Sequence, residues 1–487
     1  MLENPPTSVG TGVRRPAFIT AALAGCGLIC SFMQTLVIPL VPELPHLLST
    51  SSANASWIVT VTLLTGAVCT PISGRLGDIV GKKRVALLLL SAIVLGSLLA
   101  AAATTLVPMI IGRAFQGAGL GVIPLGISIL RDTIPAKRLG RAVALMSSTL
   151  GVGAAAGMPL SAVVSQHFDW HTLFWLSAGL SVIGIAAIWI VVPAGPQHRN
   201  ARFDLLGAVG LAVGLSGLML AVSKGADWGW AAPPTISCAV GGLLVLLGWS
   251  VYQWRASSPL VDLRVSVRRQ VLLTNLASVA VGFGLFTSPV VMPKLLEMPS
   301  TTGVGLGQSM LVTGLCMMPT GLIMMAMSPV AARVSDAYGP RACLLLGIIT
   351  ITAGYSLALL LMTQTWHTVL VGCFIGVGIG FAYAAMPTLI MQSVPESETA
   401  AANGLNTLMR SIGTSAASAV ITVILAQDVV TVNGHDYTTT TGFRLAFATA
   451  GIASAVALII AWAIPRPHRT DVDARTPAED RTSISTT

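Results

Sequence analysis

Gly74-Arg75-Leu76-Gly77-Asp78-Ile79-Val80-Gly81-Lys82-Lys83-Arg84 follows a long apolar segment in the first part of the chain. A weaker copy, Arg333-Val334-Ser335-Asp336-Ala337-Tyr338-Gly339-Pro340-Arg341, follows an apolar segment of the second half. The matching residues are Asp78 with Asp336, Gly81 with Gly339, and Lys83 with Arg341. A short motif that recurs behind two apolar segments indicates that the chain is built from two related halves.

The composition places most of the chain in lipid. Of 487 residues, 54% are apolar and only 9% are charged, whereas a soluble domain carries about 25% charged residues. The mean hydropathy of +0.81 points the same way. So few charges could not cover so large an apolar core in water. A soluble enzyme, a disordered scaffold and a nucleic-acid-binding module are excluded, although the pI is near 9.5.

Fourteen apolar stretches are long enough to cross a bilayer as helices. They lie near 17–41, 54–74, 85–105, 108–130, 141–165, 172–193, 204–223, 234–252, 271–293, 307–328, 342–362, 367–391, 400–425 and 443–464. The first motif follows the second stretch and its copy follows the tenth. This spacing predicts two six-helix bundles with stretches seven and eight inserted between them. Internal duplication of this kind is typical of transporters, because two repeats can rock about a site at the midplane.

The basic residues predict the orientation of the chain. With the N-terminus inside, 22 of the 27 Lys and Arg residues fall in inside segments. Lys224, Lys294 and Arg444 fall outside, and Arg113 and Arg410 lie within spans. This bias satisfies the positive-inside rule with both termini in the cytoplasm. The net charge of +9 is therefore a topology signal.

The expected organisation follows from the spans and the duplication. It consists of a cytoplasmic N-terminus (1–16), an N-terminal bundle (17–193), a linker with two inserted helices (194–270), a C-terminal bundle (271–464) and a disordered cytoplasmic tail (465–487).

The sequence Leu23-Ala24-Gly25-Cys26 also resembles the cleavage site of a lipoprotein signal peptide. Because the apolar run continues well past Cys26, an uncleaved first helix is expected.

The motifs resemble those of a known family. The stretch from Gly74 to Arg84 is similar to the signature loop of the major facilitator superfamily, and Gly112–Gly119 resembles its fourth-span pattern. Three further stretches look like the fourteen-span drug:proton antiporter branch: Asp204–Ala208, Pro259–Arg264, and Ala402–Asn406 ahead of Arg410. The resemblance implies an all-α integral membrane protein with the major facilitator fold. It also implies export of drug-like molecules by proton antiport and alternating access.

Asp78 is expected on a tight Gly-rich turn at the cytoplasmic end of the second span. A carboxylate there can accept hydrogen bonds from nearby Arg and complement the positive N-terminal end of a neighbouring helix. By resemblance, it locks the cytoplasmic side closed; the alternative is that the basic residues around it only anchor the topology. The expected gating residues are Gly74, Asp78, Gly81, Arg84, Asp336 and Arg341.

Two arginines lie inside spans, where a charge is costly and usually faces a partner or a wet cavity. Arg113 is shallow, so it either faces the cavity, as the resemblance implies, or snorkels to the surface. Arg410 lies about 15 Å inside its span, which favours a buried polar partner or an anionic substrate. The expected cavity and coupling residues are Arg113, Gln116, Arg410, Gln34, Asn406 and Glu43.

Two features depart from the antiporter pattern. Met33 stands where the drug antiporters have an Asp in the first span, and no acid lies inside any expected span. Glu43 at the span end is a candidate for proton coupling or an ordinary interfacial residue. Gly153, Gly157 and Pro159 resemble the antiporter motif that sets helix packing, although small-residue packing alone explains them equally well.

Other classes of function find little support in the sequence. There is no phosphate-binding loop of an ATP-driven pump, and no cofactor or metal site is expected. The expected partners are the lipid bilayer, a small-molecule substrate (neutral or anionic favoured) and protons, with no nucleic acid, and the chain is expected to be a monomer in the cell membrane. An uncoupled facilitator or uniporter of the same fold stays open because of Met33. A receptor without transport is the third class.

The topology yields a prediction for cysteine-accessibility labelling. Cysteines placed at Lys224 and Thr438 are expected to label from outside the cell, and those at His198 and Ser257 from inside. Labelling of position 198 from outside would overturn the whole assignment.

Overall fold

The computed structural model describes residues 16–40, 43–55, 57–195, 203–395, 398–432 and 435–465. Fourteen helical segments among them are long and apolar enough to cross a membrane, which confirms the number of spans. They are α1 (Pro16–Thr35), α4 (Trp57–Val80), α5 (Lys82–Ala101), α6 (Leu106–Ala118) continued by η2 (Gly119–Gly121) and α7 (Val122–Thr133), α8 (Ala136–His167), α9 (Thr172–Val191), α10 (Leu205–Trp228), α11 (Pro233–Arg255), α13 (Arg269–Glu297), α14 (Met310–Ala326) continued by α15 (Ser328–Tyr338), α16 (Pro340–Leu360), α17 (Thr365–Met391), α18 (Thr399–Gln427) and α19 (Thr440–Trp462). Short elements between them are η1 (Ile38–Leu40), α2 (Leu44–Leu47), α3 (Ser52–Ala55), α12 (Leu263–Ser266) and η3 (Ser300–Thr302). The segment before residue 16, the tail after 465 and position 198 lie outside the described residues.

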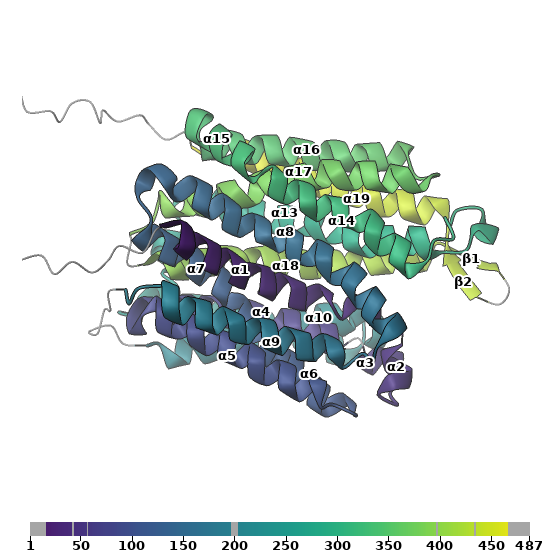
Figure 1. Cartoon of the computed structure of the whole chain (residues 1–487), viewed down its shortest axis with the longest axis horizontal. Coiled ribbons are helices and arrows are strands. Elements are labelled where there is room, and N and C mark those ends of the chain that lie inside the picture. Colours follow the sequence, from purple (N-terminus) through teal and green to yellow (C-terminus); the bar gives the residue numbers. More distant parts are fainter. Residues whose placement is uncertain are drawn as a thin grey trace, which may run out of the picture.

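The helices form two bundles, each with its own apolar core (Figure 1). One core consists of residues from Ile19 to Val192 together with Met391 and Ala400, and the other of residues from Val281 to Ile464 together with Ala144. Corresponding helices of the two bundles pack on corresponding partners: α1 on α8 as α13 on α18, and α5 on α6 and α9 as α16 on α17 and α19. This is the packing that an internal duplication predicts.

The inserted helices α10 and α11 pack on each other and cover the junction of the bundles. A small core joins Leu211 and Leu215 of α10 to Ala67 of α4 and Leu408 of α18. Helix α11 contributes little to it, since Leu243, Leu244, Leu247 and other apolar side chains along it are exposed. In a membrane this face lies against lipid.

A polar network fixes the base of the inserted pair. The Asp204 carboxylate accepts hydrogen bonds from Gly207 N at 2.7 Å, Gln253 Nε2 at 2.7 Å and the Tyr252 hydroxyl at 3.0 Å. Gln253 Oε1 then accepts from Leu260 N at 2.9 Å. The two stretches that begin at Asp204 and Pro259 are thereby joined, because the buried Gln253 satisfies polar groups of both.

The prediction that Asp78 lies on a tight turn is wrong, because Asp78 is part of helix α4. Helix α4 continues through this stretch and ends at Val80, just before Gly81, where φ is 113°. Gly339 has a φ of 86° at the matching place of the second bundle. Gly74 instead allows close packing, since a Cβ there would lie 2.6 Å from Ala400 O of α18. Only the last glycine of the motif therefore supplies the conformational freedom that a side chain would oppose.

A β-hairpin between α18 and α19 was not predicted. Strands β1 (Val429–Val432) and β2 (His435–Thr438) pair antiparallel, with Val429 opposite Thr438. The signal was present in the sequence, because four β-branched residues precede Asn433-Gly434, a pair favoured in tight hairpins. The strands lie with α2 and α3 at the end of the molecule opposite to α7 and α15 (Figure 1). We call the end with the two strands the hairpin end and the end with α7 and α15 the Asp78 end.

Lys224 lies near the hairpin end of α10 but is only 5% exposed, with its ammonium 5.4 Å from the centre of the Trp57 ring. A cysteine at Trp230, which is 50% exposed and close by in the chain, is therefore the better labelling position for this end.

The glycines of α8 give a stability prediction. A Cβ at Gly153 would lie 2.6 Å from Leu28 O and 2.8 Å from Phe32 N, both backbone atoms of α1. Gly153→Ala is therefore expected to cost about 1–3 kcal/mol through overpacking, measured as a lower melting temperature of the purified protein. Gly241→Ala in α11 is the control, since nothing lies within 4 Å of its Cβ. Equal melting temperatures for the two variants would contradict this packing.

Candidate functional site

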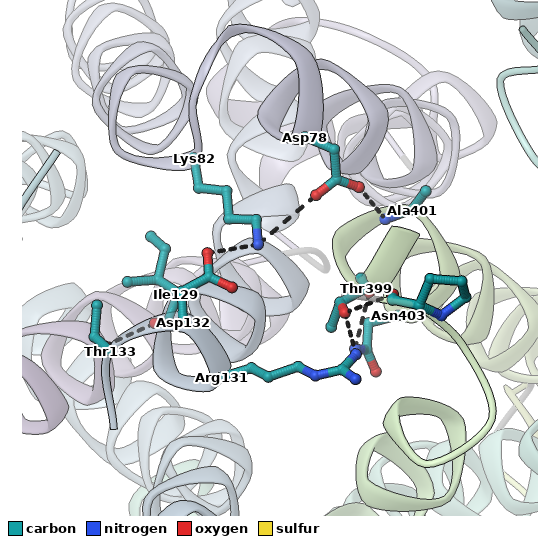
Figure 2. A network of polar contacts seen from close by, with 10 residues as sticks. Asp78, Lys82, Ile129, Arg131, Asp132, Thr133, Thr399, Ala401 and Asn403 are labelled. Atoms are coloured by element: carbon teal, nitrogen blue, oxygen red, sulfur yellow. Dashed lines mark hydrogen bonds and ion pairs between the residues drawn. The ribbon is translucent and has the colours of Figure 1, made fainter. Parts of the chain in front are cut away.

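Asp78 connects the two bundles at the Asp78 end. Its carboxylate is buried at 5% exposure, and Oδ2 accepts a hydrogen bond from Ala401 N at 3.2 Å (Figure 2). Ala401 is the third residue of α18, and Glu398 at the cap position makes no side-chain cap of its own. A side chain of the first bundle thus satisfies the helix start of the second, where a negative charge is favoured.

Lys82 holds the carboxylates of this end together. Its ammonium lies 3.8 Å from Asp78 Oδ1 and 2.6 Å from Asp132 Oδ2. Figure 2 shows Lys82 between these two acids, on the side of Asp78 away from α18. The cation therefore links the ends of α4, α5 and α7 into one unit that faces α18.

Arg131 of α7 makes the second polar contact between the bundles. Its guanidinium donates to the Thr399 hydroxyl and to Val394 O, the latter at 3.3 Å. Thr399 is the first residue of α18, two positions before the residue that Asp78 contacts. Two charged side chains of the first bundle therefore meet one helix start of the second (Figure 2).

Glu398 adds a titratable group to the same helix start. Burial raises the pKa of its carboxyl, the charge of Asp262 raises it further, and Arg75 and Arg268 oppose the rise. As the pH falls, Glu398 is therefore neutralised earlier than an exposed glutamate, beside the contact between the bundles.

The second copy of the motif is not equivalent to the first. Asp336 is exposed, and a Cβ added at Gly140 of α8 would lie 3.3 Å from its Oδ1. Arg341 donates to Trp462 O within its own bundle, and Arg84 is exposed and takes no part in the Asp78 contact. Of the six expected gating residues, the structure brings Asp78 and Gly74 to α18.

Arg113 is enclosed in the first bundle, with 1% of its surface exposed. It donates to Met33 O at 3.1 Å, Ile58 O at 3.3 Å and Gln116 Oε1 at 2.8 Å. The expectations of a cavity position or of snorkelling are thus replaced by burial among neutral acceptors. The Met33 carbonyl supplies one partner at the position where the resemblance places an Asp.

Gln116 continues this network away from Arg113. Its Nε2 donates to Ser97 Oγ at 2.8 Å, and Ser97 Oγ donates to Ser177 Oγ at 3.2 Å. The serines were not predicted, because serines in apolar spans carry no distinctive sequence signal. The chain of polar groups crosses α6, α5 and α9 inside the bundle and satisfies its members there.

A narrow cavity lies between the bundles and contains Arg410. Its lining residues are Ile123, Ile127, Ser147, Leu150, Tyr383, Pro387, Asn403, Asn406, Thr407 and Arg410. The free volume open to a water-sized sphere is about 10 Å³, room for about one water molecule, whereas pockets for drug-sized ligands measure about 300–1,000 Å³. In this conformation the cavity is therefore too small for a drug-sized ligand.

Arg410 is held without a carboxylate. Its guanidinium carbon lies 4.4 Å from the centre of the Tyr383 ring, and one nitrogen donates to Thr407 Oγ1 at 3.3 Å. Within the part of the chain that the structure describes, neither Arg410 nor Arg113 forms an ion pair. The ring face offers a desolvated cation partial compensation.

Asn406 lines the same cavity, but its amide nitrogen is engaged inside the second bundle. Nδ2 donates to Asn275 Oδ1 at 2.9 Å and to Ser278 Oγ at 2.7 Å, both on α13. Gln34 is half-buried on α1, and Glu43 is exposed beside α2 at the hairpin end. The structure therefore places Arg410 and Asn406 at the cavity, and Arg113, Gln116, Gln34 and Glu43 elsewhere.

The helix-packing residues lie where α8 meets helices of both bundles. A Cβ at Gly157 would lie 2.1 Å from Thr35 Oγ1 of α1, and a Cβ at Gly314 of α14 would lie 3.2 Å from Pro159 Cα. Small residues thus let α8 approach α1 on one side and α14 on the other.

Comparison with known proteins identifies the family. The model of the Major Facilitator Superfamily matches residues 23–418. The chain belongs to this superfamily. Members of the superfamily are transporters, and the fourteen spans make this one a multi-pass membrane protein.

Similar superfamily members carry transporter names. The chain is 28% identical to the "Multidrug resistance protein B homolog" of Mycobacterium tuberculosis over 77% of this chain and 70% of that protein. It is 26% identical to the "Putative multidrug resistance protein MdtD" of Pectobacterium carotovorum over 81% and 84%. It is 25% identical to the uncharacterized MFS-type transporter YhcA of Bacillus subtilis over 80% and 73%.

Two solved superfamily structures show the same fold. The human organic anion transporter MFSD10 has a TM-score of 0.65 at 14% identity, covering 92% of this chain and 99% of its own. The proton:xylose symporter XylE has a TM-score of 0.63 at 12% identity, covering 92% and 96%. The likeness confirms the major facilitator fold.

The Asp78 contact gives a prediction for cavity access. A negative charge near a helix N-terminus is worth about 0.3–1 kcal/mol, so its removal by Asp78→Asn is expected to raise the population of molecules open at this end about two- to fivefold. The measurement is the rate of thiol labelling of Ser147→Cys in a background without the seven native cysteines. Asp336→Asn is the matched control, because Asp336 is exposed. Equal rates for the two variants would argue against a closing role for Asp78.

Proposed function

We propose that this chain is a secondary active exporter of drug-like or antibiotic small molecules across the plasma membrane, driven by proton antiport. The observations that carry the proposal are a cavity between two duplicated bundles and the contacts of Asp78 and Arg131 with the start of α18, which join the bundles at one end. The multidrug names of two relatives support the class of cargo.

The proposed orientation rests on the basic residues. Among the described residues, most Lys and Arg side chains fall in segments at the Asp78 end. The positive-inside rule places this end in the cytoplasm, and we propose that both termini lie there too. In this reading the structure is closed toward the cytoplasm. The proposed moving parts are the bundles 17–193 and 271–464, with the linker 194–270 beside them.

The transport cycle then requires the Asp78 contact to break. Because Asp78 and Arg131 both hold the start of α18, rocking of the bundles exposes that helix start and opens the cavity to the cytoplasm. The uncompensated helix end opposes opening and favours return to the closed state. Asp78 is in this account the lock of the cytoplasmic side.

Arg410 favours neutral or anionic substrates. A monovalent cation in the cavity would meet an unneutralised guanidinium in a medium of low dielectric constant. An anion can instead pair with Arg410 and offset the cost of burying its charge.

Proton coupling has an alternative within the same fold. Met33 replaces the expected acid, and no ion pair of Arg113 or Arg410 with an acid is found among the described residues. An uncoupled facilitator or metabolite uniporter is therefore the second candidate. It predicts transport in both directions at a rate that does not depend on the pH gradient.

Uptake of antibiotics into everted vesicles distinguishes the candidates. A proton-driven exporter accumulates its substrate in the vesicles when the lumen is acidic, and collapse of the pH gradient abolishes accumulation. Equilibration without accumulation identifies the facilitator. Absence of any transport across a panel of neutral and anionic antibiotics would contradict both.

Substrate charge gives a prediction for Arg410. Because a charged hydrogen bond is worth about 1.5–3 kcal/mol, Arg410→Ala is expected to lower export of an anionic substrate at least about tenfold. The matched control is Arg444→Ala, which removes one exposed positive charge outside the cavity. Robust efflux of ethidium by the wild type, undiminished in Arg410→Ala, would refute the preference.

A further inference from the structure

Asn403 leaves a hydrogen-bond acceptor without a partner in the cavity wall. The side chain is 2% exposed, and its Oδ1 accepts no hydrogen bond from the described residues. Its Nδ2 donates to Thr399 O at 3.0 Å. This bond fixes the orientation of the amide, because the flipped amide would set two acceptors against each other.

Asn403 and Arg410 lie on the same face of α18. Seven residues are close to two helical turns and span about 10 Å along the axis. The Arg410 guanidinium bonds Thr407 Oγ1, which lies between the two positions in the chain, so its donors are displaced toward Asn403. Apolar side chains of both bundles complete the wall, among them Ile123, Leu150 and Pro387.

The two groups have complementary chemistry. Arg410 offers only donors with a positive charge, and Asn403 Oδ1 offers only an acceptor. A buried acceptor without a partner is destabilising unless a ligand or a water molecule satisfies it. The apolar surface between them suits a hydrophobic spacer.

We propose that Asn403 and Arg410 form a two-point recognition site for acids that carry a separate hydroxyl or N–H donor. The carboxylate pairs with Arg410 over the Tyr383 ring, and the donor group of the ligand bonds Asn403 Oδ1 several ångströms away. The ligand occupies the site when the bundles move apart, since the closed cavity holds about one water molecule. The inference rests on the proposed function only in assuming that this cavity binds the substrate.

The position of Asn403 connects this site to the closed end. Figure 2 shows Asn403 beside Thr399, whose hydroxyl accepts from Arg131 of the other bundle. Asn403, which binds the donor of the ligand, is itself hydrogen-bonded to Thr399. Thr399 in turn contacts Arg131 across the interface that opens in the transport cycle.

Equilibrium binding to the purified full-length protein in lipid nanodiscs tests the proposal without requiring transport. The probes are 4-hydroxycinnamate, 4-methoxycinnamate, which lacks the donor, and methyl 4-hydroxycinnamate, which lacks the carboxylate. We expect wild-type protein to bind the first at least about fivefold more tightly than either of the others, as the loss of one hydrogen bond predicts.

The variants assign each preference to a residue. Asn403→Leu is expected to abolish the preference for the hydroxyl and keep that for the carboxylate, and Arg410→Gln is expected to do the reverse. Asn403→Ala, which also removes the acceptor, serves as a second variant if Asn403→Leu does not fold. Thr414→Val is the matched control, since this residue lies one turn beyond Arg410 on α18 and outside the cavity lining.

Two results would overturn the proposal. One is a hydroxyl preference that survives in Asn403→Leu or Asn403→Ala, as expected if Asn403 binds only a water molecule. The other is equal or undetectable binding of all three probes to the wild type. If the binding pattern holds and vesicles show no export, the proposed function fails while the two-point site stands.

Discussion

We propose that the arrangement of the bundles depends on the contact between the Asp78 carboxylate and the start of α18. A helix begins with unpaired N–H groups and a partial positive charge, and α18 has no cap from Glu398. Asp78 supplies the missing acceptor from the other bundle. The donor, Ala401 N, and the acceptor, Asp78 Oδ2, belong to different bundles. Separation of the bundles therefore breaks this hydrogen bond and exposes both groups. A cap within one bundle would have no such effect.

The two copies of the duplicated motif are not equivalent in their contacts. Both copies of the motif end in a glycine with positive φ that starts the following helix. Asp78 is buried against α18, whereas Asp336 is exposed near α8. Lys82 and Asp132 support only the first copy. The two copies of the motif therefore differ in environment: the first is buried in a contact with the other bundle, and the aspartate of the second is exposed.

Much of the fold was predictable from the sequence, since the cost of an unpaired backbone in lipid makes hydropathy a direct measure of helices. The hydropathy predicted the fourteen spans, and the position of the copied motif predicted the inserted pair of helices. The continuation of α4 past Gly74 did not, because glycines are compatible with helix as well as turn. The burial of Arg113 was missed because carbonyl acceptors are present at every residue and leave no sequence signature. Asn403 was missed for the opposite reason, since its significance lies in the absence of a partner, which only a structure can reveal. The hairpin was not predicted despite its Asn-Gly pair, because hydropathy marks membrane spans and gives no signal for a short hairpin between them.

Distances between pairs of spin labels at both ends of the molecule, measured by double electron–electron resonance, test the central claim most directly. Spin labels at Arg84 and Tyr338 report on the Asp78 end, and labels at Val107 and Trp366 report on the opposite side; all four positions are exposed. If Asp78 holds the bundles together, Asp78→Asn lengthens the first distance and shortens the second in the same molecules. Unchanged distance distributions at both pairs would show that the contact does not control the arrangement of the bundles.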